Sequence, residues 1–391
     1  MKNFDDFKNF VHEGINRCII RCDLNLPSET EDLSRVYSIK ETVHRVLDLG
    51  IKVILISHYK RPSKSEAFMQ KFSLSAISEK VWEILEVNVN FMGTNIFELS
   101  QNSILGEVTL LENLRFYEEE EQNNDVFAQK LAKLADVYIN EAFSVAHRAH
   151  ASVSAITKFL PSFAGIAFEN EVKQISKIRE NIERPYTAII GGSKVSSKID
   201  VLREISQKAD YLVITGAMAN TFLTALGHKL GASIIEKTYI KIAQEIIKAS
   251  KAEIILPTDF LVSSDINMPG VCFDINDEVP ENSSCFDIGT NTIEKIKSTI
   301  KISKTLLWNG ALGAFEFANF DTSSKEISKY VAKRTKNNEL TSVIGGGETI
   351  ASIKEYKNEM TFVSTAGGAF LEYVSGYNLP GILALQSFNI S

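Results

Sequence analysis

Short apolar segments recur along the chain, separated by longer stretches with the spacing of amphipathic helices. In the first half they are Cys18–Ile20, Val53–Ile56, Val108–Leu111 and Val137–Ile139, and in the second half Thr187–Ile190, Tyr211–Ile214, Ile254–Leu256, Thr305–Trp308, Ser342–Ile344 and Thr361–Val363. Continuous apolar runs of this length are typical of parallel strands that helices cover on both faces. The pattern therefore predicts an α/β fold with two doubly wound parallel sheets, one in each half.

The length of the chain also indicates two domains, because 391 residues are more than a domain with a single hydrophobic core usually contains. No Ser/Gly/Pro-rich linker separates the halves, and no internal repeat is evident. We place the boundary between the helix-like segment 169–183 and Arg184-Pro185, where a new strand begins. This gives domains over residues 1–170 and 185–370, followed by a tail.

Composition excludes several classes of protein. Hydrophobic residues make up 44% of the chain, as in ordinary globular proteins, and no apolar run is long enough to span a membrane. The formal charge of −7 argues against affinity for nucleic acid or anionic lipid. The N-terminus lacks the apolar core of a signal peptide, and the four cysteines lack metal-ligand spacing. We expect Cys18 and Cys22 to be buried thiols in a cytoplasmic protein.

The arginines are unevenly distributed. Seven of the eleven fall in the first 150 residues: Arg17, Arg21, Arg35, Arg45, Arg61, Arg115 and Arg148. Arginine pairs bidentately with carboxylate and phosphate, so this bias suggests a small anionic ligand there. The competing interpretation is that these arginines lie on solvated helix faces.

Polar residues follow each strand of the first half, where parallel sheets bind ligands. They form the stretches RCDLNLP (21–27), SHYKRP (57–62), ENLRF (112–116) and NEAFSVAHR (140–148). One such strand end usually carries polar residues only because it is exposed to solvent, but four converging ends favour an anion site. His58 can equally be a satisfied polar residue at a strand end. The acidic run Glu118–Glu121 is expected to face solvent.

Glycine clusters follow the strands of the second half. They are GGSKVSSK (191–198), GGGET (345–349) and STAGGA (364–369). Glycine lets backbone amides approach phosphates, and lysine supplies positive charge. The first cluster lacks the ending of a Walker A loop, and tight turns explain any one cluster. Three clusters with two lysines favour a nucleotide site.

Two other kinds of site are not supported. His147 and His150 are three residues apart, but no further ligands complete a zinc site. An NAD-dependent oxidoreductase would need G-x-G-x-x-G after the first strand, which the sequence lacks.

Taken in order, the motifs resemble phosphoglycerate kinase over essentially the whole chain. The matching stretches are RCDLNLP, SHYKRP, LLENLRFYEEE, AHRAHAS, GGSKVSSK, WNGALGAFE, IGGGE and STAGGAFLE. The resemblance implies two Rossmann-like domains joined by a hinge, with the tail 380–391 returning to the first domain. It implies a glycolytic, monomeric enzyme that reversibly transfers the acyl phosphoryl group of 1,3-bisphosphoglycerate to ADP, giving 3-phosphoglycerate and ATP.

The resemblance also implies ligand contacts. The first domain would bind 3-phosphoglycerate or 1,3-bisphosphoglycerate through Arg21, Asp23, Asn25, Arg35, His58, Arg61, Arg115 and Arg148. The second would bind Mg-ADP or Mg-ATP through Gly192, Lys194, Lys198, Gly216, Asn309, Glu316, Gly345, Gly346, Gly347, Glu348 and Thr349. Arg35, Lys198 and Mg²⁺ would stabilise the transferring group, and closure of the domains would exclude water. Glu348 would be the metal ligand, or else a helix cap.

The chain departs from the family pattern at several positions. Glu348 and Glu141 replace usual aspartates, and Lys60 replaces a glycine in the SHxxRP loop. Around the nucleotide, a usual Gly, Pro and Gly are replaced by Ala217, Ala311 and Ala366, and Ser197 stands where Asp is more frequent. A degenerate paralogue that only binds ligands is the alternative to an active kinase. The retained arginines and lysines argue against it.

Overall fold

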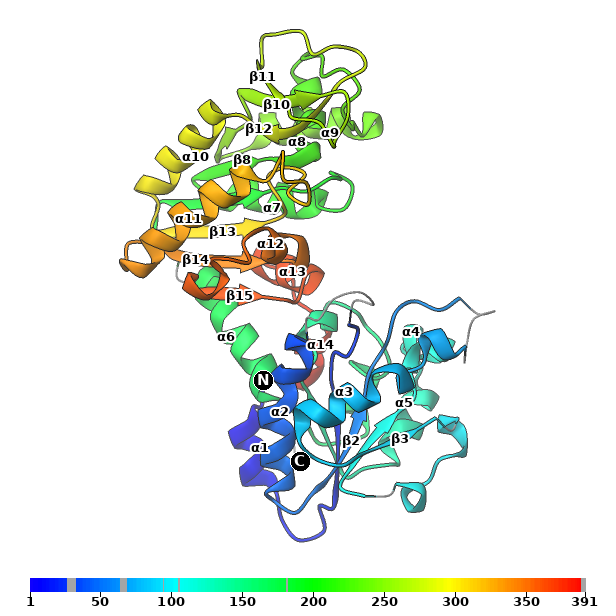
Figure 1. Cartoon of the computed structure of the whole chain (residues 1–391). Helices are drawn as coiled ribbons and strands as arrows, with labels where there is room; N and C mark the ends of the chain where they lie inside the picture. Colours follow the sequence, from blue (N-terminus) through cyan, green and yellow to red (C-terminus); the bar gives the residue numbers. More distant parts are fainter. Residues whose placement is uncertain (27–32, 64–68, 94, 105, 181, 388–391) are drawn as a thin grey trace. The chain divides into compact units, whose positions relative to one another are not determined.

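A computed structural model describes residues 1–26, 33–63, 69–93, 95–104, 106–180 and 182–387 (Figure 1). The chain forms two compact units: Met1–Gln174 with the C-terminal segment from Tyr377, and Ile175–Gly376. The division falls inside one helix, α6 (Ile166–Glu180). In the described part of the chain, no helix is both long and apolar enough to cross a membrane.

The first unit is built on a six-stranded parallel sheet in the order β3-β4-β2-β1-β5-β6. Its strands are β1 (Arg17–Arg21), β2 (Lys52–Ile56), β3 (Val89–Met92), β4 (Val108–Leu111), β5 (Val137–Asn140) and β6 (Ser162–Ala164). Its helices besides the start of α6 are α1 (Phe4–Phe10), α2 (Ser34–Leu47), α3 (Ser75–Leu85), α4 (Glu118–Glu121), α5 (Asp125–Ala132) and α14 (Pro380–Ser387). Gly381 N of α14 donates to Ala146 O at 2.8 Å, which fixes the C-terminal helix to this unit.

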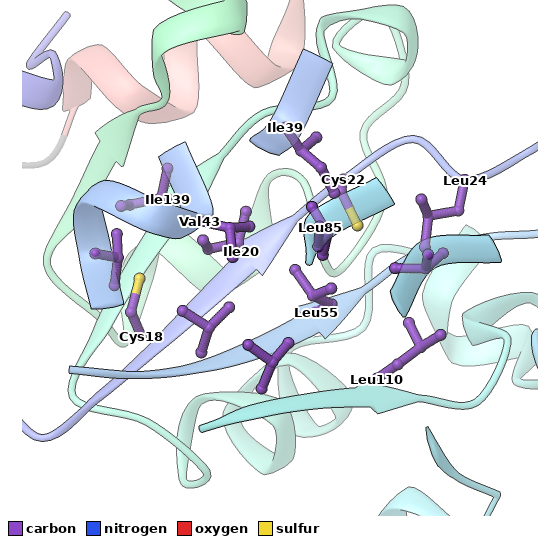
Figure 2. Close-up of a cluster of buried hydrophobic side chains, with 14 of the residues drawn as sticks. Cys18, Ile20, Cys22, Leu24, Ile39, Val43, Leu55, Leu85, Leu110 and Ile139 are labelled. Carbon is purple, nitrogen blue, oxygen red and sulfur yellow. The ribbon is translucent and has the colours of Figure 1, made fainter. Parts of the chain in front are cut away.

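The core of the first unit joins the sheet to α1, α2 and α3 (Figure 2). Helix α2 buries residues at helical spacing, including Val36, Ile39, Val43 and Val46. They pack on side chains from one face of the strands, including Cys18, Ile20, Leu55, Leu110 and Ile139. Burying each such aliphatic side chain stabilises the fold by roughly 1.5–3 kcal/mol. Cys18 and Cys22 are buried free thiols, as predicted.

The second unit contains another six-stranded parallel sheet, in the order β15-β14-β13-β7-β8-β9. Its strands are β7 (Tyr186–Ile190), β8 (Tyr211–Ile214), β9 (Glu253–Ile255), β13 (Thr305–Asn309), β14 (Thr341–Gly345) and β15 (Phe362–Ser364). Its helices are α7 (Ile199–Lys208), α8 (Gly216–Ala225), α9 (Ile240–Ala249), α10 (Thr290–Ile302), α11 (Thr322–Lys336), α12 (Gly347–Ser352) and α13 (Gly368–Ser375). Helices α10 and α11 cover one face, where they pack around the buried Trp308.

The predicted class is confirmed: both large sheets are parallel and each of the ten apolar segments forms a strand. The prediction missed β3, β6 and a three-stranded antiparallel sheet of β10 (Asp259–Ser263), β11 (Val271–Asp274) and β12 (Ser284–Ile288). Strand β11 is mostly exposed, so it has no continuous apolar run. Antiparallel strands with one face in water give a weaker hydrophobic signal than buried parallel strands.

The N-terminus of α6 is held by the buried carboxylate of Glu141, which follows β5. Its oxygens accept hydrogen bonds from Ala167 N at 3.3 Å, Phe168 N at 2.9 Å and the hydroxyl of Thr42 on α2. Burial raises the pKa of Glu141 to about 7, although these hydrogen bonds act in the opposite direction. Glu141 therefore links α2 to the helix that leaves the first unit.

We predict that Glu141→Gln flattens the pH dependence of stability. Glutamate in the unfolded chain titrates near 4.5, whereas Glu141 in the folded chain titrates at about 7. Between these values the folded state binds more protons, so the free energy of unfolding falls as pH rises, by roughly 2–3 kcal/mol from this group. Denaturant unfolding between pH 4.5 and 7.5 should therefore show a shallower slope in the variant. Glu83→Gln, at an exposed position on α3, should keep the wild-type slope; an unchanged slope in Glu141→Gln would contradict the prediction.

Candidate functional site

In the first unit, the predicted ligand residues gather where β1 lies between β2 and β5. This is the point at which the strand order reverses, and such points form crevices in parallel sheets. Asp23 accepts from Ser144 Oγ at 2.5 Å and pairs with Arg35 Nη1 at 2.8 Å. Arg35 Nη1 also donates to Asn25 O at 2.9 Å, so the start of α2 is fixed to the loop after β1.

Arg61, Arg115 and Arg148 line one cavity of about 360 Å³, together with Glu121 and His150. Arg115 Nη1 donates to Lys60 O at 3.2 Å, and its Nε lies 3.2 Å from Glu121 Oε1. Burial lowers the pKa of Arg115 to about 10; Glu121 opposes the shift, and Arg148 and Arg61 add to it. The structure thus brings together three of the predicted arginines as a concentrated positive charge.

Three histidines near this cavity are neutral at physiological pH. Burial, followed by the nearby arginines, lowers the pKa of His58 well below its usual range. Burial lowers the pKa of His147 to about 4, with Arg148 acting in the same direction. Burial also lowers the pKa of His150 to about 3. His150 lines the cavity, while the rings of His58 and His147 lie close to its arginines, and none of the three adds charge to it.

Arg21 has no exposed surface and lies close enough to Arg115 and Arg148 for its charge to lower their pKa values. Its Nε donates to Ser152 Oγ at 2.9 Å, its Nη2 donates to His58 Nδ1 at 3.2 Å, and its Nη1 donates to Cys22 O. Ser152 in turn donates through N and Oγ to Glu120, at 2.9 and 2.6 Å. All of these groups are buried, so together they form a closed polar network under the ligand residues.

Glu120 corrects one sequence expectation. The run Glu118–Glu121 was expected to face solvent, but Glu120 is only 1% exposed. The four residues form a single helical turn, which directs one of the four carboxylates inward. Nothing in a run of four identical residues shows which one is buried. Neither the burial of Glu120 nor its partner Ser152 can therefore be predicted from the sequence.

Lys60 adopts a left-handed backbone conformation, with φ of 54°. Its N donates to Asn25 Oδ1 at 2.7 Å, which holds the loop after β2 against the loop after β1. A left-handed conformation favours glycine, the residue that the family pattern has here. The lysine thus keeps the loop geometry at the cost of local strain.

In the second unit the glycine loops meet where β7 lies beside β13, again at the reversal of strand order. Gly192 N donates to Ala311 O at 3.1 Å, and Gly216 N donates to Leu312 O at 2.9 Å. A Cβ on Gly216 would stand 2.6 Å from Gly192 O, closer than real side chains approach. Glycine is therefore required at this position so that the two backbones can touch.

Lys198 lies beside these loops. Its Nζ donates to Gly191 O at 2.7 Å, and burial lowers its pKa to about 8, with the carboxylate of Glu348 opposing the shift. Glu348 itself is exposed in the first turn of α12. The lysine is thus half-buried and only partly neutralised, in a position that suits an anionic ligand.

Strand ends β13 and β14 are joined by side chains of predicted ligand residues. Thr349 Oγ1 accepts from Gly310 N at 2.6 Å and donates to Gly345 O at 2.8 Å. Asn309 Nδ2 also donates to Gly345 O, at 2.5 Å. The other amide atom, Asn309 Oδ1, is buried and has no partner among the described residues. Asn309, Gly345 and Thr349 therefore fix the loop that carries Gly346, Gly347 and Glu348.

A cavity of about 320 Å³ opens next to these loops. Four predicted residues line it: Gly192, Gly216, Glu316 and Glu348. The rest of its lining is largely apolar and includes Ile234, Phe260, Phe286, Ile288 and Leu312. This lining was not predicted, because several of its residues lie on the antiparallel strands β10 and β12, which the sequence analysis missed. Lys194 is exposed on the loop after β7.

Comparisons with known proteins identify the family. A family model described as phosphoglycerate kinase matches residues 11–377. The chain belongs to the phosphoglycerate kinase family. Its relatives include the phosphoglycerate kinases of Borreliella burgdorferi strain ZS7, 39% identical over 99% of this chain and 100% of the relative, and of Rhizobium meliloti strain 1021, 40% identical over 99% of each.

Solved structures of phosphoglycerate kinases are also similar to this chain. The enzyme from Coxiella burnetii aligns with a TM-score of 0.82 and 32% identity, covering 95% of this chain and 96% of its own. That from Pyrococcus horikoshii OT3 aligns with a TM-score of 0.84 and 28% identity, covering 99% and 98%. Phosphoglycerate kinases are glycolytic phosphotransferases with a carboxyl group as acceptor, and they use ADP or ATP, generally with Mg²⁺.

Proposed function

We propose that this chain is an active kinase that transfers the acyl phosphoryl group of 1,3-bisphosphoglycerate to ADP, and the reverse. The first unit would bind the phosphoglycerate and the second unit the Mg-nucleotide. The observation that carries the proposal is the meeting of Arg61, Arg115 and Arg148 around one cavity. A ligand with a phosphate and a carboxylate is what such a set of guanidinium groups recognises.

The remaining predicted residues of the first unit complete this pocket. His58 would donate a neutral hydrogen bond, since its pKa is held low by burial and the arginines. Asp23 and Asn25 would accept from the hydroxyl group of the ligand. Arg35, which pairs with Asp23, would turn to the transferring phosphoryl group.

The second unit suits a nucleotide for two reasons. Its cavity of about 320 Å³ has a largely apolar lining that matches a flat base, with the exposed carboxylate of Glu316 available to ribose hydroxyls. Backbone amides and lysines at the strand ends suit the phosphates. We assign the phosphate contacts to Gly192, Lys194, Lys198, Gly216, Asn309, Gly345, Gly346, Gly347 and Thr349.

The described residues fit a metal that arrives with the nucleotide. No group of three or more His, Cys, Asp or Glu side chains in the described chain could hold a metal ion by itself. Mg²⁺ is commonly bound by one or two carboxylates together with substrate phosphates. Glu348 could supply that carboxylate, and the metal would neutralise charge on the phosphates.

Phosphoryl transfer requires alignment of the substrates and stabilisation of charge, and it does not require a general base. The carboxylate of 3-phosphoglycerate is already ionised at neutral pH, so no proton must be removed before it attacks ATP. In-line transfer places charge on the equatorial oxygens of the phosphoryl group. We assign their stabilisation to Arg35 and Lys198. Because one chain carries both sets of residues, we further propose that a monomer suffices for the reaction. We also propose that the protein is cytoplasmic.

A coupled assay of ATP formation from 1,3-bisphosphoglycerate and ADP tests the proposal directly. Turnover at a rate typical of kinases, about 1–100 per second or more, is expected. Binding of both ligands without turnover would instead indicate the degenerate paralogue, and the proposed function would be wrong.

Replacing Arg61, Arg115 or Arg148 by Ala should mainly raise KM for the phosphoglycerate. A contact made equally in the ground and transition states acts on KM, and each charged contact contributes about 1.5–3 kcal/mol, or roughly 10- to 100-fold. Steady-state kinetics measures this effect. Arg45→Ala, which removes an exposed arginine paired with Glu41, is the matched control and should leave KM unchanged. Normal KM in all three site variants would contradict the assignment.

Lys198→Ala and Arg35→Ala should lower kcat by about 100-fold or more, with smaller changes in either KM. These cations are proposed to act on charge that develops only during transfer. Lys251→Ala, at an exposed position of the second unit, provides the control. Near-normal kcat in Lys198→Ala would show that the transfer geometry proposed here is wrong.

Glu348→Gln should weaken binding of Mg-ADP clearly more than binding of metal-free ADP. The neutral amide is a poorer ligand for Mg²⁺ than the carboxylate. Glutamine has the same side-chain length as glutamate, so the substitution changes the charge and not the reach of residue 348. Calorimetric titration of ADP with and without Mg²⁺ measures both affinities. An equal loss of affinity in the two titrations would show that Glu348 does not bind the metal and acts only as a favourable charge at the start of α12.

A further inference from the structure

Four buried groups form a continuous hydrogen-bonded chain close to the arginines of the cavity. From Glu120 the chain runs through the hydroxyl of Ser152 to the guanidinium of Arg21, and from there to the imidazole of His58. The first three have exposed fractions of 1%, 0% and 0%, and His58 has 5%. His58 therefore keeps the largest exposed fraction of the four side chains.

The direction of the hydrogen bond between Arg21 and His58 follows from the chemistry of the two side chains. Arginine has no acceptor, so the bond of 3.2 Å from Arg21 Nη2 makes His58 Nδ1 an acceptor. A neutral imidazole carries one hydrogen, which must then be on Nε2. No described residue accepts a hydrogen bond from Nε2 in the structure.

Arg21 has little freedom to serve a ligand itself. It has no exposed surface, and all three of its nitrogens donate within the chain, to Ser152, Cys22 and His58. Turning toward the cavity would break these bonds and leave the carboxylate of Glu120 without its compensating charge. An unpaired buried charge is strongly unfavourable.

We propose that Arg21 does not contact the phosphoglycerate but is a positioning residue, which holds His58 as the tautomer with hydrogen on Nε2. Glu120, acting through Ser152, holds Arg21 in place. Nε2–H then donates to an anionic oxygen of the ligand. This inference rests on the proposed function and revises one part of it, since the resemblance places Arg21 among the direct ligand contacts.

The choice of tautomer matters because the ring is neutral. A charged imidazole would donate from both nitrogens, whatever its neighbours. Burial and the charges of Arg21, Arg115, Arg148 and Arg35 lower the pKa of His58 well below its usual range, so this form is not populated near pH 7. In the other neutral tautomer, Nε2 would turn a lone pair toward the anionic ligand and repel it.

The tautomer can be read without any ligand. In wild-type protein labelled with ¹⁵N-histidine, long-range ¹H–¹⁵N spectra at pH 7 should show His58 as a single Nε2–H tautomer, assigned with His58→Ala. Arg21→Met removes the donor to Nδ1 and should produce a mixture of tautomers. An Nδ1–H ring in the wild type, or an unchanged ring in Arg21→Met, would overturn the proposal. This readout stands even if the protein turned over no phosphoglycerate, so it separates failure of the inference from failure of the proposed function.

A double-mutant cycle tests whether Arg21 acts through His58. Arg21→Met should raise KM for the phosphoglycerate about tenfold in the wild-type background and less than about threefold in the His58→Ala background. Equal factors in both backgrounds would mean that Arg21 binds the ligand directly, and would overturn the proposal. Arg45→Met is the matched control, and KM for ADP together with the thermal unfolding midpoint reports folding.

Ser152→Ala tests the outer half of the chain and replaces Arg21→Met if that variant does not fold. It keeps both buried charges and removes only the hydroxyl between them. It should broaden the tautomer distribution of His58 and raise the same KM, with a smaller effect in the His58→Ala background. Unchanged spectra and KM in Ser152→Ala would show that Glu120 and Ser152 do not position Arg21.

Discussion

The buried guanidinium of Arg21 is the charge around which the first unit is arranged. It stands at the carboxyl end of the central strand β1 and bonds to the end of β2 through His58 and to the segment after β5 through Ser152. Glu120 supplies the opposite charge from α4. Ser152 bridges the two charges, and removing either of them would leave the other buried and uncompensated, which is strongly unfavourable. The network therefore couples the stability of the unit to the position of its ligand residues.

The same unit holds the arginines that line the cavity close to one another, so that their charges repel. The pKa of Arg115 is lowered to about 10, mainly by burial, and Arg148, Arg61 and Arg21 contribute through repulsion. An anionic ligand bound among these guanidinium groups would offset that repulsion. Functional sites often retain unfavourable interactions of this kind at the expense of stability.

The second unit meets a different constraint, which is steric. Its loops touch backbone to backbone, as in the contact from Gly192 N to Ala311 O, and a side chain at Gly216 would separate them. Ala311 stands where the family usually has Pro, and the contact is made by its carbonyl oxygen, which either residue provides. The substitution is therefore compatible with the packing of these loops.

The sequence by itself determined the two parallel sheets and the stretches that carry ligand residues. Apolar runs such as Val53–Ile56 are buried on both faces, so a continuous run of hydrophobic residues is enough to identify a buried strand. Polar residues at strand ends, such as Arg61 and Arg115, follow from the same pattern, because parallel strands end at one edge of the sheet. Both inferences depend only on neighbours along the chain.

Tertiary structure decided what each charged side chain contacts. Arg21 and Arg61 look alike in the sequence, yet one is enclosed by Ser152, Cys22 and His58 while the other lines a cavity. Glu120 differs from its three neighbouring glutamates only in the direction that one helical turn gives it. Burial and hydrogen-bond partners come from segments more than a hundred residues apart, as with Arg21 and Ser152. No local pattern encodes such contacts, because the energy that selects them exists only once the chain has folded.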